Sequence, residues 1–449
     1  MNYNLESFCP EPWSQLEIDA EGDFKLCCLA NYADDNGLAM DEDDSVMNIM
    51  THSFDQAMNS ETHKQHRIAL SKNIKVPRCR NCYISEEATF GKIDSFPEGQ
   101  SKRQGTILKT AKMIPEYATV DTVASITNLD GSISNPKIVN LDLRFGNLCN
   151  QKCIMCSPQF SSLWYEDWTV INQSTDEKPI AVEKGRYKKY IIEQDRRGKL
   201  HMPEMVNWWE SSIWWDKFET IAADLRFIYL TGGEPLLVPA LQECLDRLIR
   251  RDLAKNIIIK FDTNCSVINP KVIEKLKQFK DVLFCVSVDE VGQDRYHVIR
   301  NPGDYNRLIE NMKFLLSNNF RIHWISSCIG TATPYAVIRV LELADELKVD
   351  SFFRFLEGPK WLDIRNYPSA AKKEIIDNLQ PYTKKPSWDR WVGAEIHVLE
   401  KFMNYEHQPR VQKFVDNMNI LDSRRNIDWK RSLPDVYELI KNHCNKVEI

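Results

Sequence analysis

The chain has 449 residues, of which 43% are hydrophobic and 27% are charged, and its formal net charge is -6. This length exceeds what one hydrophobic core normally serves, so two or more domains are expected. The mild acidity argues against a nucleic-acid partner, because such binding relies on basic residues that neutralise phosphates. The N-terminus lacks a basic region followed by an apolar run, and no stretch is apolar for long enough to span a membrane. We therefore expect a cytoplasmic protein without a nucleic-acid or membrane partner.

The chain contains 13 cysteines, which favours metal binding or catalysis over disulfides in a reducing compartment. Five of them lie in the first fifth of the chain and three lie on one central loop. The others are scattered singly and are expected to be buried core thiols. These scattered cysteines are Cys244, Cys265, Cys285, Cys328 and Cys444.

The N-terminal cysteines occur in two segments of the chain. Residues 15–28 alternate around an Asp/Glu/Gly turn and predict a β-hairpin, whose open end would bring together Cys9 and the adjacent Cys27 and Cys28. A helical stretch is expected over residues 53–70. Four thiolates, completed by Cys79 and Cys82 on a later tight loop, can close around an iron–sulfur cluster or zinc. Strict alternation would put Cys27 and Cys28 on opposite faces of a strand, so only one of them is expected to be a ligand.

The remainder of the chain changes pattern several times. Residues 1–95 predict a small N-terminal cluster-binding domain of β-hairpin and helix, and residues 96–135 predict a linker. Residues 136–357 predict the core, in which residues 159–225 form an insertion with half of the chain's tryptophans. That insertion is either a cap or a helical segment whose aromatic rings fill a core. Residues 358–449 predict a helical C-terminal region.

In the core, apolar runs alternate with helical patterns. Strands are expected over 136–145, 227–230, 257–261, 282–288, 322–326 and 352–355, with helices over 239–251, 270–279, 304–318 and 334–347. This alternation predicts an α/β fold of parallel βα units with right-handed crossovers. We expect a partial (β/α)6 TIM-like barrel, and a doubly wound sheet is the alternative. In both folds, ligands gather at the carboxyl ends of the strands.

The loop after the first core strand carries Cys149, Cys153 and Cys156 at spacings of three and two residues. Three thiolates on one loop can hold three irons of a cubane and leave the fourth open, whereas structural zinc normally has four protein ligands. The next strands end in Thr231-Gly232-Gly233-Glu234-Pro235, in Thr263-Asn264, and in Ser287-Val288-Asp289.

Taken in this order, residues 138–355 resemble the radical S-adenosylmethionine (SAM) superfamily. The resemblance implies that Cys149, Cys153 and Cys156 ligate a 4Fe-4S cluster, whose open iron is chelated by the amino and carboxylate groups of SAM. The residues implied to contact SAM are Gly232, Gly233, Glu234, Thr263, Asn264, Ser287, Asp289 and Arg300, with Arg307 as a near alternative to Arg300. Two positions depart from the family pattern, namely Met155, where an aromatic residue is usual, and Cys265, where glycine is common.

The N-terminal cysteines resemble the SPASM/twitch modules that carry auxiliary iron–sulfur clusters. The likeness rests on the spacing from Cys9 to Cys27, on Gly22 between them, and on the later pair Cys79 and Cys82. It implies one auxiliary 4Fe-4S cluster held by those four cysteines, with Cys27 rather than Cys28 as a ligand. The module precedes the barrel here, whereas it usually follows it. Structural zinc in a ribbon remains the alternative.

The resemblance implies that the protein reductively cleaves SAM to a 5′-deoxyadenosyl radical, which abstracts hydrogen from a substrate. A peptide or protein side chain is the favoured substrate, and a flavodoxin or ferredoxin is the expected electron donor. One alternative is radical oxidation or rearrangement of a small molecule, such as a sugar or a cofactor precursor. Another is an iron–sulfur redox or binding protein without turnover.

Overall fold

The computed structural model describes residues 7–30, 37–88, 102–173, 181–184, 188–203 and 205–449. The chain divides into two compact units. Unit 1 comprises residues 1–148, 179–260 and 271–282, and unit 2 comprises residues 149–178, 261–270 and 283–449. Neither unit is one continuous stretch of the chain.

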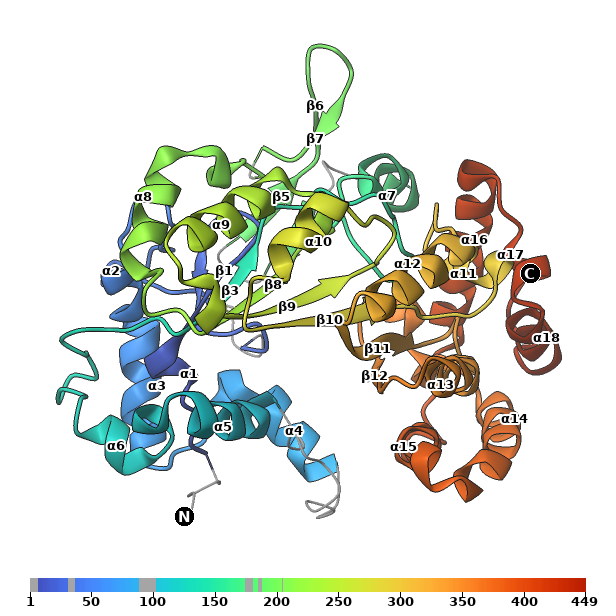
Figure 1. Ribbon diagram of the computed structural model, residues 1–449. Coiled ribbons are helices and arrows are strands. Elements are labelled where there is room, and N and C mark those ends of the chain that lie inside the picture. The colour runs from blue at the N-terminus through green and yellow to red at the C-terminus, as the bar shows by residue number, and fades with distance from the viewer. Residues whose placement is uncertain (1–6, 31–36, 89–101, 174–180, 185–187, 204) are drawn as a thin grey trace. The chain divides into compact units, whose positions relative to one another are not determined.

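The main β-sheet has eight strands in the order β12-β11-β10-β9-β8-β3-β1-β2 (Figure 1). Their bounds are β1 Gln15–Ile18, β2 Phe24–Lys25, β3 Asn140–Arg144, β8 Phe227–Thr231, β9 Ile258–Thr263, β10 Asp281–Ser287, β11 Arg321–Ile329 and β12 Ser351–Phe355. From β3 to β12 the order in the sheet equals the order in the chain, whereas a doubly wound sheet would reverse it at a switch point. The order confirms the α/β fold and favours the partial barrel over the doubly wound alternative.

The N-terminal hairpin of unit 1 is part of this sheet. β1 pairs antiparallel with β2 and parallel with β3, with Gln15 opposite Asn140. The hairpin was predicted, but its second strand is short because the Leu26 N–H bonds to the Gly37 carbonyl at 2.9 Å instead of continuing along β1. The pairing of β1 with β3 was not predicted, since the register of strands remote in sequence is set by tertiary packing.

The two faces of the sheet in unit 1 differ in polarity. One face is fully apolar, and its residues are Leu16, Ile18, Leu141, Leu143, Ile228 and Leu230. The other face carries Glu17, Asp142 and Tyr229 directly opposite one another on β1, β3 and β8. Parallel strands are usually apolar on both faces, so the polar face is the unusual one.

Unit 1 also contains several helices. They are α1 Glu11–Ser14, α2 Phe54–Met58, α3 Glu61–Ser71, α4 Arg80–Ala88, α5 Lys102–Met113, α6 Val120–Ala124, α8 Ser212–Ile221, α9 Pro239–Arg250 and α10 Pro270–Leu276. The helix expected over 53–70 is divided in two because the Ser60 side chain accepts the His63 N–H and caps α3. α5 and α6 occupy part of the segment expected as a linker. Two small hairpins complete the unit, β4 Ala181–Lys184 with β5 Lys188–Ile191 and β6 Glu193–Gln194 with β7 Leu200–His201.

The tryptophans of the insertion that lie in unit 1 fill its core. Trp208, Trp209 and Trp214 are at most 8% exposed. Their rings pack against Phe145, with centroid distances of 5.6, 6.2 and 6.3 Å. These rings therefore support the turn that follows β3, as expected of core aromatic residues.

Unit 2 contains the end of the sheet and the C-terminal helices. Its helices are α7 Trp164–Gln173, α11 Gln293–Ile299, α12 Tyr305–Ser317, α13 Ala336–Leu347, α14 Ser369–Leu379, α15 Pro386–Lys401, α16 Gln408–Arg425, α17 Trp429–Ser432 and α18 Pro434–His443. The helical C-terminal region is confirmed. α11 was not predicted, because it is short and begins in a loop directly after Gly292.

None of the helices in the described ranges has both the length and the apolar character needed to cross a membrane.

Candidate metal and cofactor sites

The cysteine loop begins in unit 1, where the turn after β3 is closely packed. Gly146 has φ 68°, and a Cβ placed there would lie 2.3 Å from the Trp209 ring. A Cβ on Gly233 would lie 2.1 Å from the carbonyl oxygen of Leu148, the residue before Cys149. The Glu234 N–H also donates to this oxygen, at 2.8 Å. The Gly-Gly-Glu-Pro loop therefore needs glycine at position 233 to approach the backbone that leads into the cysteines.

The three loop cysteines lie in unit 2, anchored to the end of α11. The Lys152 N–H donates to the Asn301 carbonyl at 2.6 Å, and the Ile154 N–H donates to the Ile299 carbonyl at 2.9 Å. Both bonds flank Cys153, whose side chain is buried. Its carbonyl accepts the indole N–H of Trp164 at 3.0 Å. The loop is thus held by backbone hydrogen bonds on both sides of its central cysteine.

The three loop thiols influence one another electrostatically. Burial raises the pKa of the Cys156 thiol, and the neighbouring Cys153 and Cys149 raise it further. Burial also raises the pKa of Cys153, which the positive charge of Arg300 lowers. The Cys149 sulfur accepts the Gln151 N–H at 3.4 Å. Mutually repelling thiolates are stabilised by binding a cation, so this donor set fits a metal centre.

Arg300 and Asp289 form a buried ion pair beside Cys153. Arg300 Nη2 lies 2.5 Å from Asp289 Oδ2, and Arg300 Nη1 donates to the Cys153 sulfur at 3.6 Å. The other Asp289 oxygen accepts the Cys328 N–H at 2.7 Å. The Arg300 Nε is buried and has no hydrogen-bond partner among the described residues. The Arg300 guanidinium can therefore donate from Nε to a ligand while its Nη2 pairs with Asp289.

The strand end at Thr263 and Asn264 contacts the cysteine loop within unit 2. Asn264 Nδ2 donates to Asn150 Oδ1 at 2.9 Å and lies 3.9 Å from the Cys149 sulfur. Thr263 Oγ1 accepts the Cys265 N–H at 2.9 Å. Cys265 itself has φ 53°, in the left-handed region that favours glycine, which explains why glycine suits this position.

The structure thus groups the predicted residues by unit. Unit 2 brings Cys149, Cys153, Cys156, Asn264, Asp289 and Arg300 together, with Thr263 and Ser287 at the ends of β9 and β10. Gly232, Gly233 and Glu234 lie in unit 1, against Leu148. Arg307, the alternative to Arg300, pairs with Glu310 at 3.8 Å, and its side chain is 56% exposed.

The N-terminal thiols gather in unit 1. Cys9, Cys27 and Cys79 line one small cavity. Burial raises the pKa of the Cys9 thiol, and the charges of Glu11, Cys79 and Cys82 raise it further. Burial also raises the pKa of Cys79 to about 12 and that of Cys82 to about 11. Buried thiols that repel one another in this way fit a shared metal or cluster, and both iron–sulfur and zinc remain compatible with four cysteines.

Cys27 and Cys28 are not separated by strand alternation, because β2 ends at Lys25. They lie in a turn, where Lys102 Nζ is 3.7 Å from the Cys27 sulfur and 3.1 Å from the Cys28 sulfur. Cys27 faces the cavity with Cys9 and Cys79, whereas Cys28 faces the polar side of the sheet. The choice of Cys27 as the ligand stays a prediction. The turn, rather than strand alternation, is what directs the two side chains to different sides.

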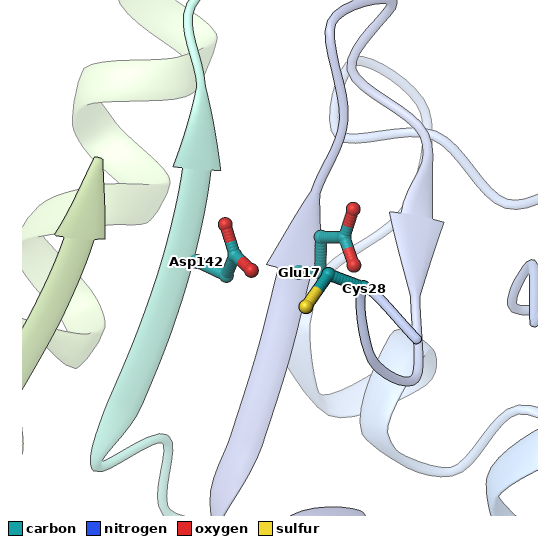
Figure 2. Close-up of side chains that lie close together, drawn as sticks. All are labelled: Glu17, Cys28 and Asp142. Carbon is teal, nitrogen blue, oxygen red and sulfur yellow. The ribbon is translucent and has the colours of Figure 1, made fainter. Parts of the chain in front are cut away.

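Figure 2 shows the Cys28 side chain beside Glu17 on β1 and Asp142 on β3. Their ligand atoms all lie within 4.8 Å of one another. Arg144 lies 3.1 Å from Glu17 Oε1, and Lys102 contacts the Cys28 sulfur. Since these cations balance Glu17 and Cys28, we interpret the group as a buried charge network that adjoins the auxiliary thiols.

Sequence reasoning missed two basic residues at these sites. Lys102, which also pairs with Glu11 at 3.2 Å, lay in the segment expected as a linker. Arg425 lies in the C-terminal region, where no site was expected, and its charge lowers the pKa of Cys153. No motif marks either residue, because only the tertiary structure brings them to the cysteines.

Two family models match the chain. Residues 215–351 match the radical SAM superfamily, and residues 9–83 match an iron–sulfur cluster-binding domain, SPASM. The cysteine loop lies between the two matched segments. A radical SAM domain implies a 4Fe-4S cluster with SAM, and a SPASM domain implies an auxiliary iron–sulfur cluster.

Solved structures with some similarity include one described as native anSMEcpe with bound AdoMet, at 16% identity and a TM-score of 0.35. The alignment covers 54% of this chain and 60% of that chain. A second is described as native anSMEcpe with bound AdoMet and Kp18Cys peptide, at 15% identity and a TM-score of 0.35, covering 54% and 59%. This chain thus spans about 60% of the length of the first of these proteins.

No curated protein sequence was found to match the chain. The domain assignment therefore rests on these two matches, of which the second contains the N-terminal cysteines and the first contains part of the parallel sheet. The chain carries a radical SAM domain match over residues 215–351 and, ahead of it, an iron–sulfur cluster-binding domain match over residues 9–83.

Proposed function

We propose that the protein uses SAM and a 4Fe-4S cluster held by Cys149, Cys153 and Cys156 to abstract hydrogen from a peptide or protein side chain. The observation that supports this proposal is the cysteine loop of unit 2, in which the Arg300 guanidinium lies 3.6 Å from the Cys153 sulfur. When bound, the cluster and SAM supply one-electron cleavage of a carbon–sulfur bond and a hydrogen-abstracting carbon centre.

The protein's own residues bind and orient these groups. Gly233 and Glu234 are proposed to receive the SAM amino group, and Arg300 Nε is proposed to donate to the SAM carboxylate while Nη2 stays on Asp289. Asn264, Thr263, Ser287 and Asp289 are proposed to contact the ribose or carboxylate. Such fixed donors make the bound geometry reproducible and exclude water from the reacting atoms.

The auxiliary site is proposed to hold a 4Fe-4S cluster on Cys9, Cys27, Cys79 and Cys82. Lys102 and Arg103 lie beside this set of cysteines, and their positive charges would offset the negative charge of a centre with four thiolates. Arg103 Nε donates to Glu86 at 3.0 Å, and its Nη1 donates to the Phe8 carbonyl, next to Cys9, at 2.9 Å. A flavodoxin or ferredoxin is the proposed electron donor, and the cytoplasm is the proposed location.

Anaerobic reconstitution tests the activity. The wild type with reductant and SAM should form 5′-deoxyadenosine, and the variant with Cys149, Cys153 and Cys156 changed to Ala should not. A control with Cys244, Cys285 and Cys444 changed to Ala removes the same number of thiols at buried positions outside the loop. Product from the loop variant, or none from the wild type, would refute the proposal.

The substrate class needs a second experiment. The peptide preference rests on the SPASM match over residues 9–83 and its family resemblance. A cell extract from deuterium-grown cells can be divided into macromolecules and small molecules and supplied to the reconstituted protein. A peptide substrate is supported if 5′-deoxyadenosine acquires deuterium only with the macromolecular fraction. Protease treatment of that fraction should then abolish the deuterium transfer. Deuterium only with the small molecules would favour the alternative.

A further inference from the structure

Arg425 is a buried cation at the end of α16, in the C-terminal helical region. Its side chain is 0% exposed. The helix ends directly after it, because Asn426 takes a left-handed conformation with φ 51°. A guanidinium without contact to water needs acceptors for all of its N–H groups.

Two residues of α7 fix the orientation of this guanidinium. Arg425 Nε donates to Asp167 Oδ2 at 2.8 Å, and its Cζ lies 4.7 Å from the centre of the Trp164 ring. Asp167, only 1% exposed, also accepts Arg424 Nε at 2.8 Å and pairs with Lys152 Nζ at 2.9 Å. The guanidinium is therefore held along one edge and on one face.

The other edge of the guanidinium is not satisfied by the chain. Arg425 Nη1 and Nη2 are buried, and neither has a hydrogen-bond partner among the described residues. Burying charged donors without an acceptor is costly, so such an arrangement persists where a further group provides one. The charge of the donors requires that this group be an anion or a polarised acceptor.

The same contacts place the guanidinium beside Cys153. Trp164, whose ring contacts the Arg425 guanidinium, donates its indole N–H to the Cys153 carbonyl at 3.0 Å. Lys152, which shares Asp167 with Arg425, is the residue before Cys153. The charges of Arg300 and Arg425 both lower the pKa of the Cys153 thiol.

We propose that Arg425 donates from Nη1 and Nη2 to the sulfur atoms of the cluster at Cys149, Cys153 and Cys156, and that its charge raises the reduction potential of this cluster. The inference rests on the proposed function, which places the cluster there. One electron enters the cluster from an external one-electron donor and adds one negative charge. A fixed positive charge with N–H donors at the sulfurs stabilises the reduced form more than the oxidised form. Arg425 is thus a positioning and tuning residue supplied by α16.

The test compares Arg425→Met with Arg424→Met in the full-length reconstituted protein. Both variants lose one positive charge and one contact with Asp167, but the Arg424 side chain is 30% exposed. Each protein is held, without SAM, at the potential where the wild-type cluster is half reduced. The reduced fraction is measured by electron paramagnetic resonance. The relevant signal is identified by its change when SAM is added afterwards, because the auxiliary cluster has no open iron.

We expect the ratio of reduced to oxidised cluster to fall about tenfold in Arg425→Met, which corresponds to about 59 mV for one electron. Arg424→Met should change the ratio by less than about twofold, because exposed charges are screened. Arg425→Lys keeps the charge without the planar fork, and it should fall between the wild type and Arg425→Met. This variant also preserves a readout if Arg425→Met folds poorly.

The outcomes separate the inference from the proposed function. An unchanged ratio in Arg425→Met at full iron content would overturn the inference alone, and so would equal changes in Arg425→Met and Arg424→Met. A change that appears only with SAM present would also overturn it, since Arg425 would then bind the cofactor. A wild type without any SAM-responsive signal would overturn the proposed function and the inference with it.

Discussion

Arg300 and Arg307 show how differently two nearby residues of one type are used. Arg300 is 8% exposed, between Asp289 and the Cys153 sulfur, whereas Arg307 lies on the exposed side of α12 with Glu310. The sequence pattern could not separate them because both follow the same strand end. Their burial and partners favour Arg300 as the residue of the site.

Replacing Arg300 by Met should destabilise unit 2 strongly, by about 3–5 kcal/mol, because Asp289 would be left buried without its partner. Arg307→Met is the matched control, and it should cost at most about 1 kcal/mol because its ion pair is exposed. Denaturant unfolding of the metal-free proteins measures both values. Similar losses in the two variants would contradict the assignment.

Gly233 is a second residue whose role follows from local geometry. Gly233→Ala should destabilise unit 1 by about 1–3 kcal/mol, because the new Cβ would overlap the Leu148 carbonyl and force the backbone to shift. The same variant should weaken SAM binding, measured by equilibrium dialysis. The control is Gly393→Ala, inside α15, where alanine should stabilise the helix by up to about 1 kcal/mol. A neutral Gly233→Ala would show that this loop tolerates displacement.

At the scale of elements, the pairing of β1 with β3 creates a charged row inside unit 1. Asp142 on β3 is 2% exposed, and neither of its carboxylate oxygens has a hydrogen-bond partner among the described residues. Burial raises its pKa well above 3.8, and the charges of Glu17 and Cys28 raise it further, while Arg144 and Lys102 lower it. Asp142 therefore holds its proton more tightly in the folded than in the unfolded state.

This pKa shift predicts how stability depends on pH. The stabilising effect of the Asp142 proton is complete below the unfolded pKa of about 3.8 and is lost as the pH rises through the folded pKa. Asp142→Asn cannot lose a proton, so its thermal midpoint should rise relative to the wild type as the pH increases above 3.8. The control is Asp246→Asn, at a position on α9 that pairs with Lys275. Its thermal midpoint should differ from that of the wild type by the same amount across this pH range. A constant difference for Asp142→Asn as well would contradict the predicted shift.

At the scale of the whole molecule, the two cysteine sets belong to different units. The loop cysteines are in unit 2 and the auxiliary cysteines are in unit 1. Changing Cys9, Cys27, Cys79 and Cys82 to Ala should therefore remove the iron and sulfide of one cluster and leave the SAM-responsive signal. Iron and sulfide analysis with electron paramagnetic resonance checks this. Undiminished iron in the variant would refute the auxiliary cluster, and zinc in the wild type would favour the ribbon alternative.

Metal removal should also affect stability, because binding to the folded state adds to its free energy of unfolding. Chelation should lower the thermal midpoint of the wild type. The quadruple Ala variant should show a smaller decrease, since it has already lost one site. Equal decreases in both proteins would indicate that the auxiliary thiols hold no metal.

Much of this architecture could be predicted because it depends on short-range patterns. The six core strands, their helices and the N-terminal hairpin follow from hydrophobic periodicity, which reflects local burial. The loop cysteines and the Gly-Gly-Glu-Pro loop follow from spacing along a few residues. α11 and the break between α2 and α3 were missed, since single caps and short helices carry weak signals.

The sequence by itself determined the α/β fold class and indicated the radical SAM and iron–sulfur cluster-binding domains, because hydrophobic periodicity and cysteine spacing are patterns that the sequence carries directly. Only the tertiary structure decided that β1 continues the sheet beside β3, that Lys102 lies beside the turn with Cys27 and Cys28, and that Arg425 packs against Trp164 and Asp167. These features join segments far apart in sequence. Their pairing depends on packing and on the cost of burying charge, which no local pattern records.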